Sequence, residues 1–190
     1  MKTVKVEIEG LTPLLMNRFT DETEVKISSG TSSTMRGNWG TPREQAAKTA
    51  YKDEKGNLYI PGANLFKAII EGGRFHKIGK KQVTISNSTM ITGGVFLKEV
   101  VLPLGTKKFE VDSRSVVING KSRIMKHRAR LDTWKLTFEL EIDDTIFTVD
   151  FVRQFVEDAG KRIGLGDFRP DRKGQFGRFA ITKWQTNGKN

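Results

Sequence analysis

Apolar and polar residues alternate at the N-terminus and again near residue 135, and this alternation predicts two half-buried β-strands. Every second residue is apolar from Val4 to Ile8 and from Trp134 to Ile142. Successive side chains of a strand point to opposite faces, so one face of each strand should line the core while the other carries charge. Shorter apolar runs predict further strands at residues 58–60, 94–102 and 177–184.

Three segments carry the signals of a helix. Thr41-Pro42-Arg43-Glu44 has a capping-box pattern with proline at the first helical position, so a helix should begin there. A second helix should follow Pro61-Gly62 and end at Gly72-Gly73. Thr148 can cap a third helix, and Gly160 is predicted to take the left-handed position that ends it.

The order of the main elements predicts the fold class. Strand, helix, strand, strand, helix, strand is the order of an α+β, ferredoxin-like (RRM-like) split β-α-β sandwich, in which two main helices cover one face of an antiparallel sheet. Asn119-Gly120 is a strong hairpin turn and predicts an inserted β-hairpin. We expect one domain over residues 1–190, with a polar, mobile excursion at about 17–40 and a basic hairpin insertion at about 107–130.

The charge balance narrows the class of partner. The chain has 33 Lys and Arg against 22 Asp and Glu, a net charge of +11, which is typical of proteins that bind nucleic acid or an anionic membrane surface. No apolar run reaches the roughly 20 residues that span a bilayer, and the N-terminus lacks a signal-peptide block, so we expect a cytoplasmic protein without a membrane partner. The absence of cysteine excludes disulfides and thiolate zinc sites, and we expect no metal and no cofactor.

Residues 161–178, here called the glycine-rich segment, are the most informative part of the chain. Glycine lets a backbone approach a ligand, arginine binds phosphate oxygens in a fork, and an exposed phenylalanine stacks on an unpaired base. The pattern is neither G-x-G-x-x-G nor a P-loop, which argues against a nucleotide cofactor. An alternative is that the glycines only permit a turn and the phenylalanines fill the core. The candidate nucleic-acid-binding residues here are Arg162, Gly164, Gly166, Phe168, Arg169, Arg172, Lys173 and Arg178.

Two further basic groups support the same partner. Residues 121–130 hold five positive residues and no acid, so an extended arm there could follow successive phosphates. The alternative is a solvated edge strand, in which lysine guards against aggregation. The candidates in this run are Lys121, Arg123, Lys126, Arg128 and Arg130. Arg74 and Lys77, after the second helix, are also candidates, although cations at a helix end are commonly only solvated.

The sequence gives little support for catalysis. His76 or His127 could act as a general base, and Asp21 could assist RNA cleavage, but neither histidine has an identifiable partner. We therefore favour a protein that is not an enzyme.

Two segments resemble the RAMP (repeat-associated) superfamily. Residues 59–70 are similar to its I-P-G-S-S-L-K-G-A-[IL]-R helix start, and Gly164-Leu-Gly166 resembles its glycine-rich loop. The nearest type is the repeating backbone subunit of CRISPR effector complexes, whose copies stack along a guide RNA and whose β-hairpin thumb kinks it. The resemblance implies a ferredoxin-like fold, RNA binding and head-to-tail assembly. Ala63-Asn64 departs from the usual small hydroxyl pair, and Glu71 falls near the expected arginine.

The chain also resembles an uncharacterised group of small bacteriophage proteins. The similarity lies in Leu11-Thr-Pro-Leu-Leu-Met-Asn17, in Ser122-Arg123 with Trp134, and in residues 164–170. This resemblance spans most of the chain and implies no known activity.

Together these observations predict a protein that coats single-stranded DNA or RNA largely without sequence specificity. It should form a homo-oligomer, head to tail along the strand, in a bacterial or phage-infected cell. Two alternatives remain open. One is a RAMP-type, metal-independent endoribonuclease, and the other is a phage structural or assembly protein.

Overall fold

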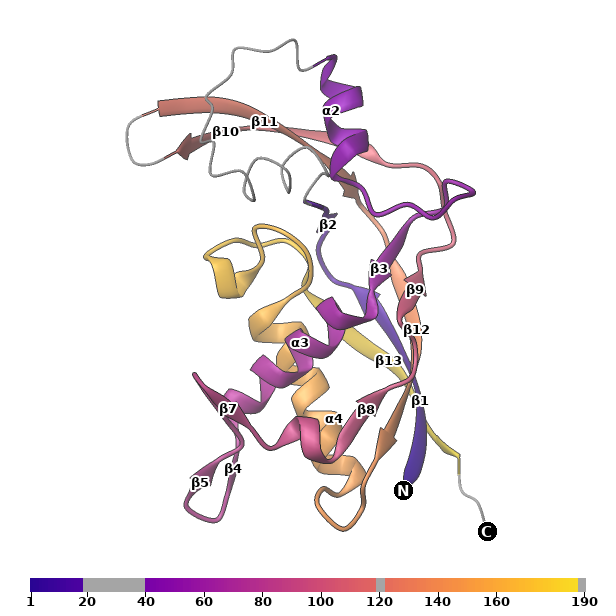
Figure 1. Cartoon of the computed structure of the whole chain (residues 1–190), viewed down its shortest axis with the longest axis vertical. Coiled ribbons are helices and arrows are strands. Elements are labelled where there is room, and N and C mark those ends of the chain that lie inside the picture. The colour runs from indigo at the N-terminus through magenta and orange to yellow at the C-terminus, as the bar shows by residue number, and fades with distance from the viewer. Residues whose placement is uncertain (19–39, 119–121, 188–190) are drawn as a thin grey trace, which may run out of the picture.

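A four-stranded antiparallel sheet forms the base of the protein (Figure 1). The structure is a computed structural model that describes residues 1–18, 40–118 and 122–187. The strand order is β13-β1-β12-β8. Their bounds are Phe179–Asn187 for β13, Lys2–Gly10 for β1, Lys135–Ile142 for β12 and Val95–Leu97 for β8.

The alternation in the two central strands sets their register. β1 and β12 pair antiparallel with Val6 opposite Phe138 and Ile8 opposite Leu136, so the apolar residues of both strands share one face. These side chains are fully or almost fully buried. Both strands predicted from alternation are confirmed.

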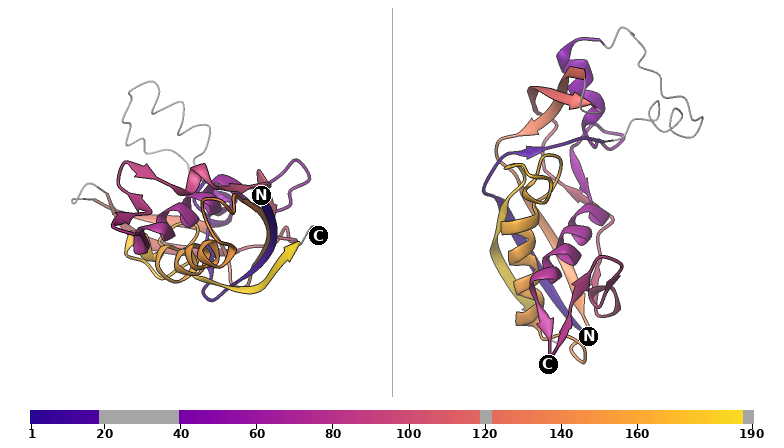
Figure 2. Two further views of the ribbon diagram at one scale, coloured as in Figure 1. Left: turned by 90° about the horizontal axis from the view of Figure 1, so that it is seen from below. Right: turned by 90° about the vertical axis from the view of Figure 1, so that its left-hand side faces the viewer.

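Two helices cover the apolar face of this sheet (Figure 2). α3 (Gly62–Gly72) follows the short strand β3 (Tyr59–Pro61), and α4 (Val149–Asp158) begins after Thr148, whose side chain accepts a hydrogen bond from the Phe151 amide. Leu65 and Ile69 of α3 are buried in the core beneath them. Strand order and helix placement confirm the α+β ferredoxin-like fold.

The end of α4 differs from the sequence prediction. The chain does not leave the helix at Gly160 but continues through a π-helical turn, η3 (Ala159–Ile163), and the positive φ of 76° belongs to Gly164. Gly160 is needed for a different reason, because an added Cβ would collide with the carbonyl oxygen of Phe179. The predicted left-handed position was therefore four residues early, since Gly160 is required for close packing of the helix end on β13.

The basic hairpin stands beyond the end of the main sheet (Figure 1). β10 (Glu110–Ile118) pairs with β11 (Ser122–Leu131), and β11 also pairs with β2 (Leu14–Leu15). The predicted turn at Asn119-Gly120 and residues 19–39 of the predicted excursion lie outside the described residues. The inserted hairpin and the single domain over 1–190 remain our interpretation of the architecture.

The helix predicted at residue 41 holds the base of this hairpin. α2 (Pro42–Thr49) begins with the predicted capping box, in which the Thr41 amide donates to Glu44 and the Glu44 amide donates to the Thr41 hydroxyl. The hydrogen bonds that the Thr41 amide and hydroxyl donate to the Glu44 carboxylate lower the pKa of that carboxyl. At the other end, the Thr49 hydroxyl accepts a hydrogen bond of 2.9 Å from the Ala129 amide of β11.

The predicted strand at 94–102 is split between two sheets. β8 ends at Leu97, and β9 (Val101–Pro103) pairs with β3 instead. The Glu99 carboxylate accepts the Glu139 amide with both oxygens at 3.0 Å, so a side chain occupies a place in the β12 ladder. The remaining short elements are η1 (Gly73–Phe75), β4 (Lys77–Ile78), β5 (Lys81–Gln82), β6 (Thr84–Ile85), β7 (Ser88–Thr89), η2 (Ile91–Gly93) and η4 (Pro170–Arg172).

Candidate nucleic-acid interface

The register of the hairpin divides the predicted basic run between two faces. Lys126 lies opposite Arg114 and Arg128 lies opposite Asp112, whereas Arg123 lies opposite Val117. Because side chains alternate along a strand, Lys126, Arg128 and Arg130 share one face and Arg123 lies on the other. The run is therefore not one strip of phosphate ligands. Lys121 lies outside the described residues.

The face with Lys126 and Arg128 is turned towards the glycine-rich segment. Nε of Arg128 lies 2.9 Å from Oδ2 of Asp167, and the Arg128 side chain is only 9% exposed. The guanidinium of Arg114 lies 4.8 Å from the centre of the Phe176 ring, within the range of a cation–π contact. An ion pair and a cation–π contact thus join the hairpin to the glycine-rich segment.

Three arginines lie close to a second carboxylate of the segment, that of Asp171. Oxygens of Asp171 lie 3.4 Å from Arg169, 3.7 Å from Arg172 and 3.7 Å from Arg74. Arg74 comes from η1, so this carboxylate joins the glycine-rich segment to the basic group after α3. Arg74 also pairs with Glu71 at 3.2 Å, so two carboxylates among three guanidiniums leave a small local excess of positive charge.

Arg162 extends this basic surface along the end of α4. Its guanidinium lies 4.5 Å from the centre of the Phe75 ring, and its Nε lies 2.9 Å from Asp158. Beyond η1, the side chain of Gln82 in β5 donates to the carbonyl of Arg74. The exposed lysines of β4 and β5, including Lys77, therefore follow directly on the arginine cluster.

These contacts place three separate basic segments next to one another. Figure 1 shows the hairpin, the loop before β13 and the β4–β5 turn along one side of the molecule. We call this surface the basic track. It consists of Arg74, Lys77, Lys126, Arg128, Arg162, Arg169, Arg172 and Lys173. Among the described residues, no carboxylate pairs with Lys77, Lys126 or Lys173 in an ion pair.

The glycines of the segment are required for contacts within the protein. Gly166 has a positive φ of 74°, and an added Cβ would collide with the Leu15 carbonyl oxygen. That carbonyl accepts a hydrogen bond of 2.7 Å from the Asp167 amide. Gly164 likewise has a positive φ. An added Cβ at Gly164 would meet Pro170 and Arg169 of the same segment. The structure thus explains Gly166 by contact with β2 and Gly164 by the turn of the loop, and their direct approach to a ligand stays a prediction.

The phenylalanines of the segment divide between core and surface. Phe179 is buried and Phe176 is largely so, which confirms the alternative reading for these two rings. Phe168 is 41% exposed and has a φ of 49°, a conformation that is strained for a bulky residue. Its ring rests against Phe176 with the centres 6.1 Å apart. The surrounding loop thus holds Phe168 on the surface, where stacking on a base stays a prediction.

Lys126 is electrostatically unfavourable in the protein alone. Partial burial and the neighbouring Arg128 charge lower its pKa, and Asp167 opposes this effect only in part. Burial removes water from the ammonium group, and a like charge raises the cost of its protonated form. A phosphate group at this position would offset both effects.

Lys173 belongs to the track, and Arg178 lies at its margin. Lys173 is exposed at the end of η4, in a left-handed conformation with a φ of 60°. The amide of Arg178 donates to the Thr12 hydroxyl, and its carbonyl accepts from Leu11 and Thr12, so this residue lies at the start of β13 beside residues 11–12. Binding by any of the predicted residues stays a prediction.

The open face of the main sheet has a different electrostatic character. Glu7 pairs with Lys183 at 2.9 Å, and Glu139 pairs with Lys98 at 2.8 Å. These pairs lower the pKa of both carboxyls. Neutralised charges and few aromatic residues make this face a poor platform for stacked bases.

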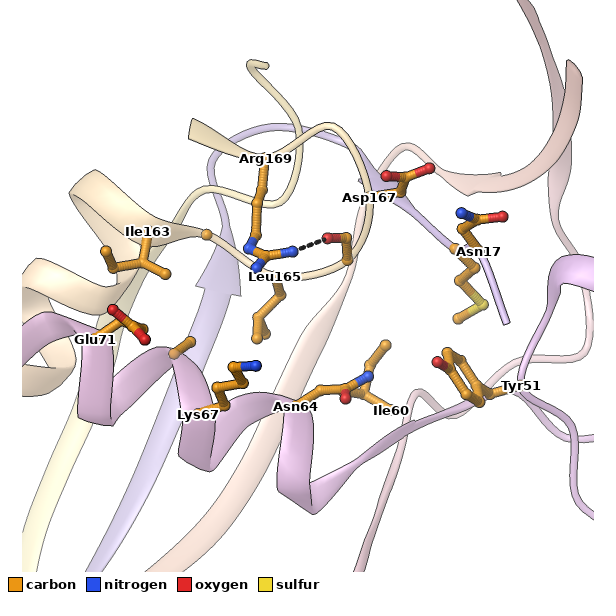
Figure 3. A pocket seen from close by; sticks show the side chains of 14 residues that line it. Asn17, Tyr51, Ile60, Asn64, Lys67, Glu71, Ile163, Leu165, Asp167 and Arg169 are labelled. Atoms are coloured by element: carbon orange, nitrogen blue, oxygen red, sulfur yellow. Dashed lines mark hydrogen bonds between the residues drawn. The ribbon is translucent and has the colours of Figure 1, made fainter. Parts of the chain in front are cut away.

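A pocket of about 340 Å³ lies between α3 and the glycine-rich segment (Figure 3). Figure 3 shows Asn64 and Lys67 of α3 on one side and Arg169 on the other, with Asn17 and Tyr51 at one end. Sequence reasoning missed Asn64 and Lys67. Helical periodicity could have found them, because both lie away from the buried Leu65 and Ile69.

The two histidines are held by neighbouring side chains. Nε2 of His76 lies 2.8 Å from Asp158, and its ring packs edge-on against Phe155. Nδ1 of His127 lies 2.7 Å from the Ser113 hydroxyl, on the hairpin face opposite Lys126. Catalysis by either histidine stays a prediction, and Asp21 lies outside the described residues.

The described part of the chain contains no group of three or more His, Asp or Glu side chains arranged to hold a metal ion. None of its helices is both long and apolar enough to cross a bilayer.

Comparison with known proteins identifies similarity in structure only. No protein-family model matches the sequence, and no curated protein matches it. Among solved structures, a chain from the cryo-EM structure of the type III-B Cmr-beta bound to cognate target RNA is similar, with a TM-score of 0.56 and 16% identity. The match covers 97% of this chain and 60% of that one, so this protein spans less than two thirds of its neighbour. The likeness shows the fold.

The unfavourable position of Lys126 leads to a prediction about stability. Lys126→Met should raise the free energy of unfolding by roughly 0.5 kcal/mol, because a half-exposed ammonium beside Arg128 is replaced by an apolar chain of similar length. The pKa of Lys126 is lower in the folded state than in the unfolded state. Between these two pKa values the unfolded state binds more protons, so the free energy of unfolding of the wild type rises with pH. The stabilisation of Lys126→Met relative to the wild type should therefore shrink as pH rises towards about 10.

Urea unfolding at several pH values measures this effect. Lys183→Met is the matched control, since it removes an ammonium that pairs with Glu7 at 2.9 Å and should slightly lower stability. A greater loss of stability in Lys126→Met than in the control would contradict the prediction.

Proposed function

We propose that the protein binds single-stranded nucleic acid along the basic track, mainly through the phosphate backbone and largely without sequence specificity. The single observation that carries the proposal is the meeting of three basic segments that are far apart in sequence. Arg128–Asp167 joins the hairpin to the glycine-rich segment, and Arg74–Asp171 joins that segment to η1. A surface that follows three elements suits a polymer of regularly spaced charges better than a small anion.

Charge and exposed aromatics support this partner over other polyanions. Residues 161–178 carry six Lys and Arg against two Asp, and both carboxylates are already in contact with arginine. Phe168 adds an exposed ring beside these cations. Aromatic rings among cations are the combination that proteins use for unpaired bases, because each base has a flat face that stacks without regard to sequence.

RNA is the first candidate for the strand. The structural neighbour was solved bound to cognate target RNA, and residues 59–70 and 164–166 resemble segments of the RAMP superfamily. We further propose that the protein acts as a backbone subunit and not as an enzyme. The resemblance to bacteriophage proteins favours instead single-stranded DNA as the ligand of the same surface.

Binding should depend on salt and on the cations of the track. Arg172→Glu/Lys173→Glu should weaken binding of a labelled single strand of about 12 nucleotides by at least tenfold at low salt. Each lost phosphate contact should also reduce the slope of log affinity against log salt by roughly 0.7. Fluorescence anisotropy over a salt series, with RNA and DNA of the same sequence, measures both quantities.

Lys135→Glu/Lys183→Glu is the matched control for this experiment. It makes the same change in net charge on the open sheet face, where both lysines pair with glutamates. The proposal fails if the wild type shows no salt-dependent binding, or if both double variants weaken binding equally.

Head-to-tail assembly along the strand is the second part of the proposal. The hairpin exposes apolar side chains towards its tip, with Val117 57% and Met125 55% exposed. Exposed apolar residues at the end of a projecting element are suited to contact another copy. The RAMP resemblance implies the same arrangement.

The mass of the complex should then grow in steps as the oligonucleotide lengthens. Multi-angle light scattering should show one further copy for each added increment of strand, and Val117→Ser/Met125→Ser should leave one copy bound to a short strand but reduce assembly on a long one. Val100→Ser is the control, because Val100 is 83% exposed but lies away from the hairpin. Assembly without nucleic acid would instead favour a structural protein, and one copy on strands of every length would exclude the stacked arrangement.

A further inference from the structure

The pocket between α3 and the glycine-rich segment has unused hydrogen-bonding groups. Asn17, Tyr51 and Asn64 line it, and within the described ranges no hydrogen bond engages their side chains. The three residues come from the segment after β2, the segment after α2 and the first turn of α3. Polar side chains from three elements directed into one hollow are typical of a ligand site.

Acidic and basic side chains both line the pocket. Two carboxylates line it, Glu71 and Asp167, and each is in contact with an arginine outside, Arg74 at 3.2 Å and Arg128 at 2.9 Å. Lys67 has no ion-pair partner among the described residues, and Figure 3 shows it across the pocket from Arg169, whose guanidinium donates to the Gly166 carbonyl. Arg169 is a residue of the track, so the pocket adjoins the track on this side.

The wall of the pocket is apolar behind these groups. Met16, Ile60 and Leu165 line it, and all three are almost fully buried. A phosphate group in contact with such a surface would lose water without gaining hydrogen bonds, which is costly. A nucleobase is better suited, since its faces are apolar and its polar groups lie along one edge.

We propose that this pocket binds one nucleobase of the strand, turned out of the basic track. The inference rests on the proposed function and assigns a subsite to it. The ring packs between Leu165 and Tyr51, the side-chain amide of Asn64 binds the edge of the base, and Lys67 and Arg169 bind its phosphate. Asn64 and Lys67 are three residues apart in α3, so they lie on the same side of the helix and reach one nucleotide together.

The two carboxylates also select among bases. A carboxylate oxygen accepts a hydrogen bond from the exocyclic amino group of cytosine, whereas uracil presents a carbonyl oxygen at the same place and would be repelled. The carboxylate oxygens of Asp167 and Glu71 offer acceptors on the lining of the pocket. Cytidine should therefore bind more tightly than uridine, and this preference modulates a largely sequence-independent interaction.

Three small probes test the pocket without requiring binding to a long strand. Titrations of CMP, UMP and ribose 5-phosphate are followed by NMR on isotope-labelled protein, with the amide signals of Tyr51, Asn64 and Leu165 as reporters. CMP should bind about tenfold more tightly than ribose 5-phosphate because of the base contact. UMP should be several-fold weaker than CMP.

Two variants identify the groups that bind the base and the phosphate. Asn64→Leu should reduce CMP affinity about tenfold and leave ribose 5-phosphate binding unchanged, whereas Lys67→Gln should weaken both ligands. Asn87→Leu, in the exposed β6–β7 turn, is the matched control and should change neither. Each variant is first shown to be folded by its NMR spectrum.

The outcomes separate this inference from the proposed function. Equal affinity for CMP and ribose 5-phosphate, or an unchanged CMP affinity in Asn64→Leu, overturns the base pocket even if long strands bind the track. Equal binding of CMP and UMP overturns the role of the carboxylates. Mononucleotide binding in a protein that fails to bind any oligonucleotide would support the pocket and contradict the proposed track.

Discussion

Two carboxylates of the glycine-rich segment, Asp167 and Asp171, make it possible for three basic parts of the chain to lie together. Mutual repulsion opposes the placement of arginines from η1, from the hairpin and from the segment itself on one surface. Asp167 contacts Arg128 of the hairpin, and Asp171 lies within 4 Å of Arg74, Arg169 and Arg172. Each carboxylate offsets this repulsion locally, and the surface as a whole stays positive.

A short stretch of backbone after α4 positions these carboxylates. The π-helical turn after α4 leads to Gly164, and Gly166 brings the chain against the Leu15 carbonyl, to which the Asp167 amide donates. The segment is thereby attached to β2, the strand that also pairs with the hairpin. The same short stretch of backbone therefore fixes the Asp167 side chain beside Arg128 and leaves Phe168 exposed in a strained conformation. Strain and close backbone contact in a surface loop are expected where a loop is held in one shape for binding.

Sequence reasoning identified the elements whose side chains have a clear period or a specific cap. The alternation around Val6 and Phe138, the capping box at Thr41 and the hairpin strands were all predictable, because the signal lies in local neighbours. The basic segments were also visible in the sequence. Their arrangement was not, since the faces of Arg123 and Arg128 depend on a strand register that no local pattern determines.

The errors in prediction come from contacts between distant residues. In the sequence Gly160 resembles a glycine that ends a helix. Glycine is required there for another reason, because the Phe179 carbonyl, 19 residues later in the chain, leaves no room for a Cβ. The strand expected at 94–102 is split because the Glu99 side chain reaches the Glu139 amide. The pocket was missed for the same reason, since Tyr51, Asn64 and Arg169 are close only in the folded chain.

Lysine acetylation measured by mass spectrometry, with and without single-stranded RNA, tests most directly whether the basic segments form one binding surface. A single track predicts that Lys77, Lys126 and Lys173 are protected together and at the same RNA concentration, while Lys5, Lys135 and Lys183 of the sheet react as before. Protection confined to one of the three segments, or equal protection of the sheet lysines, would contradict it.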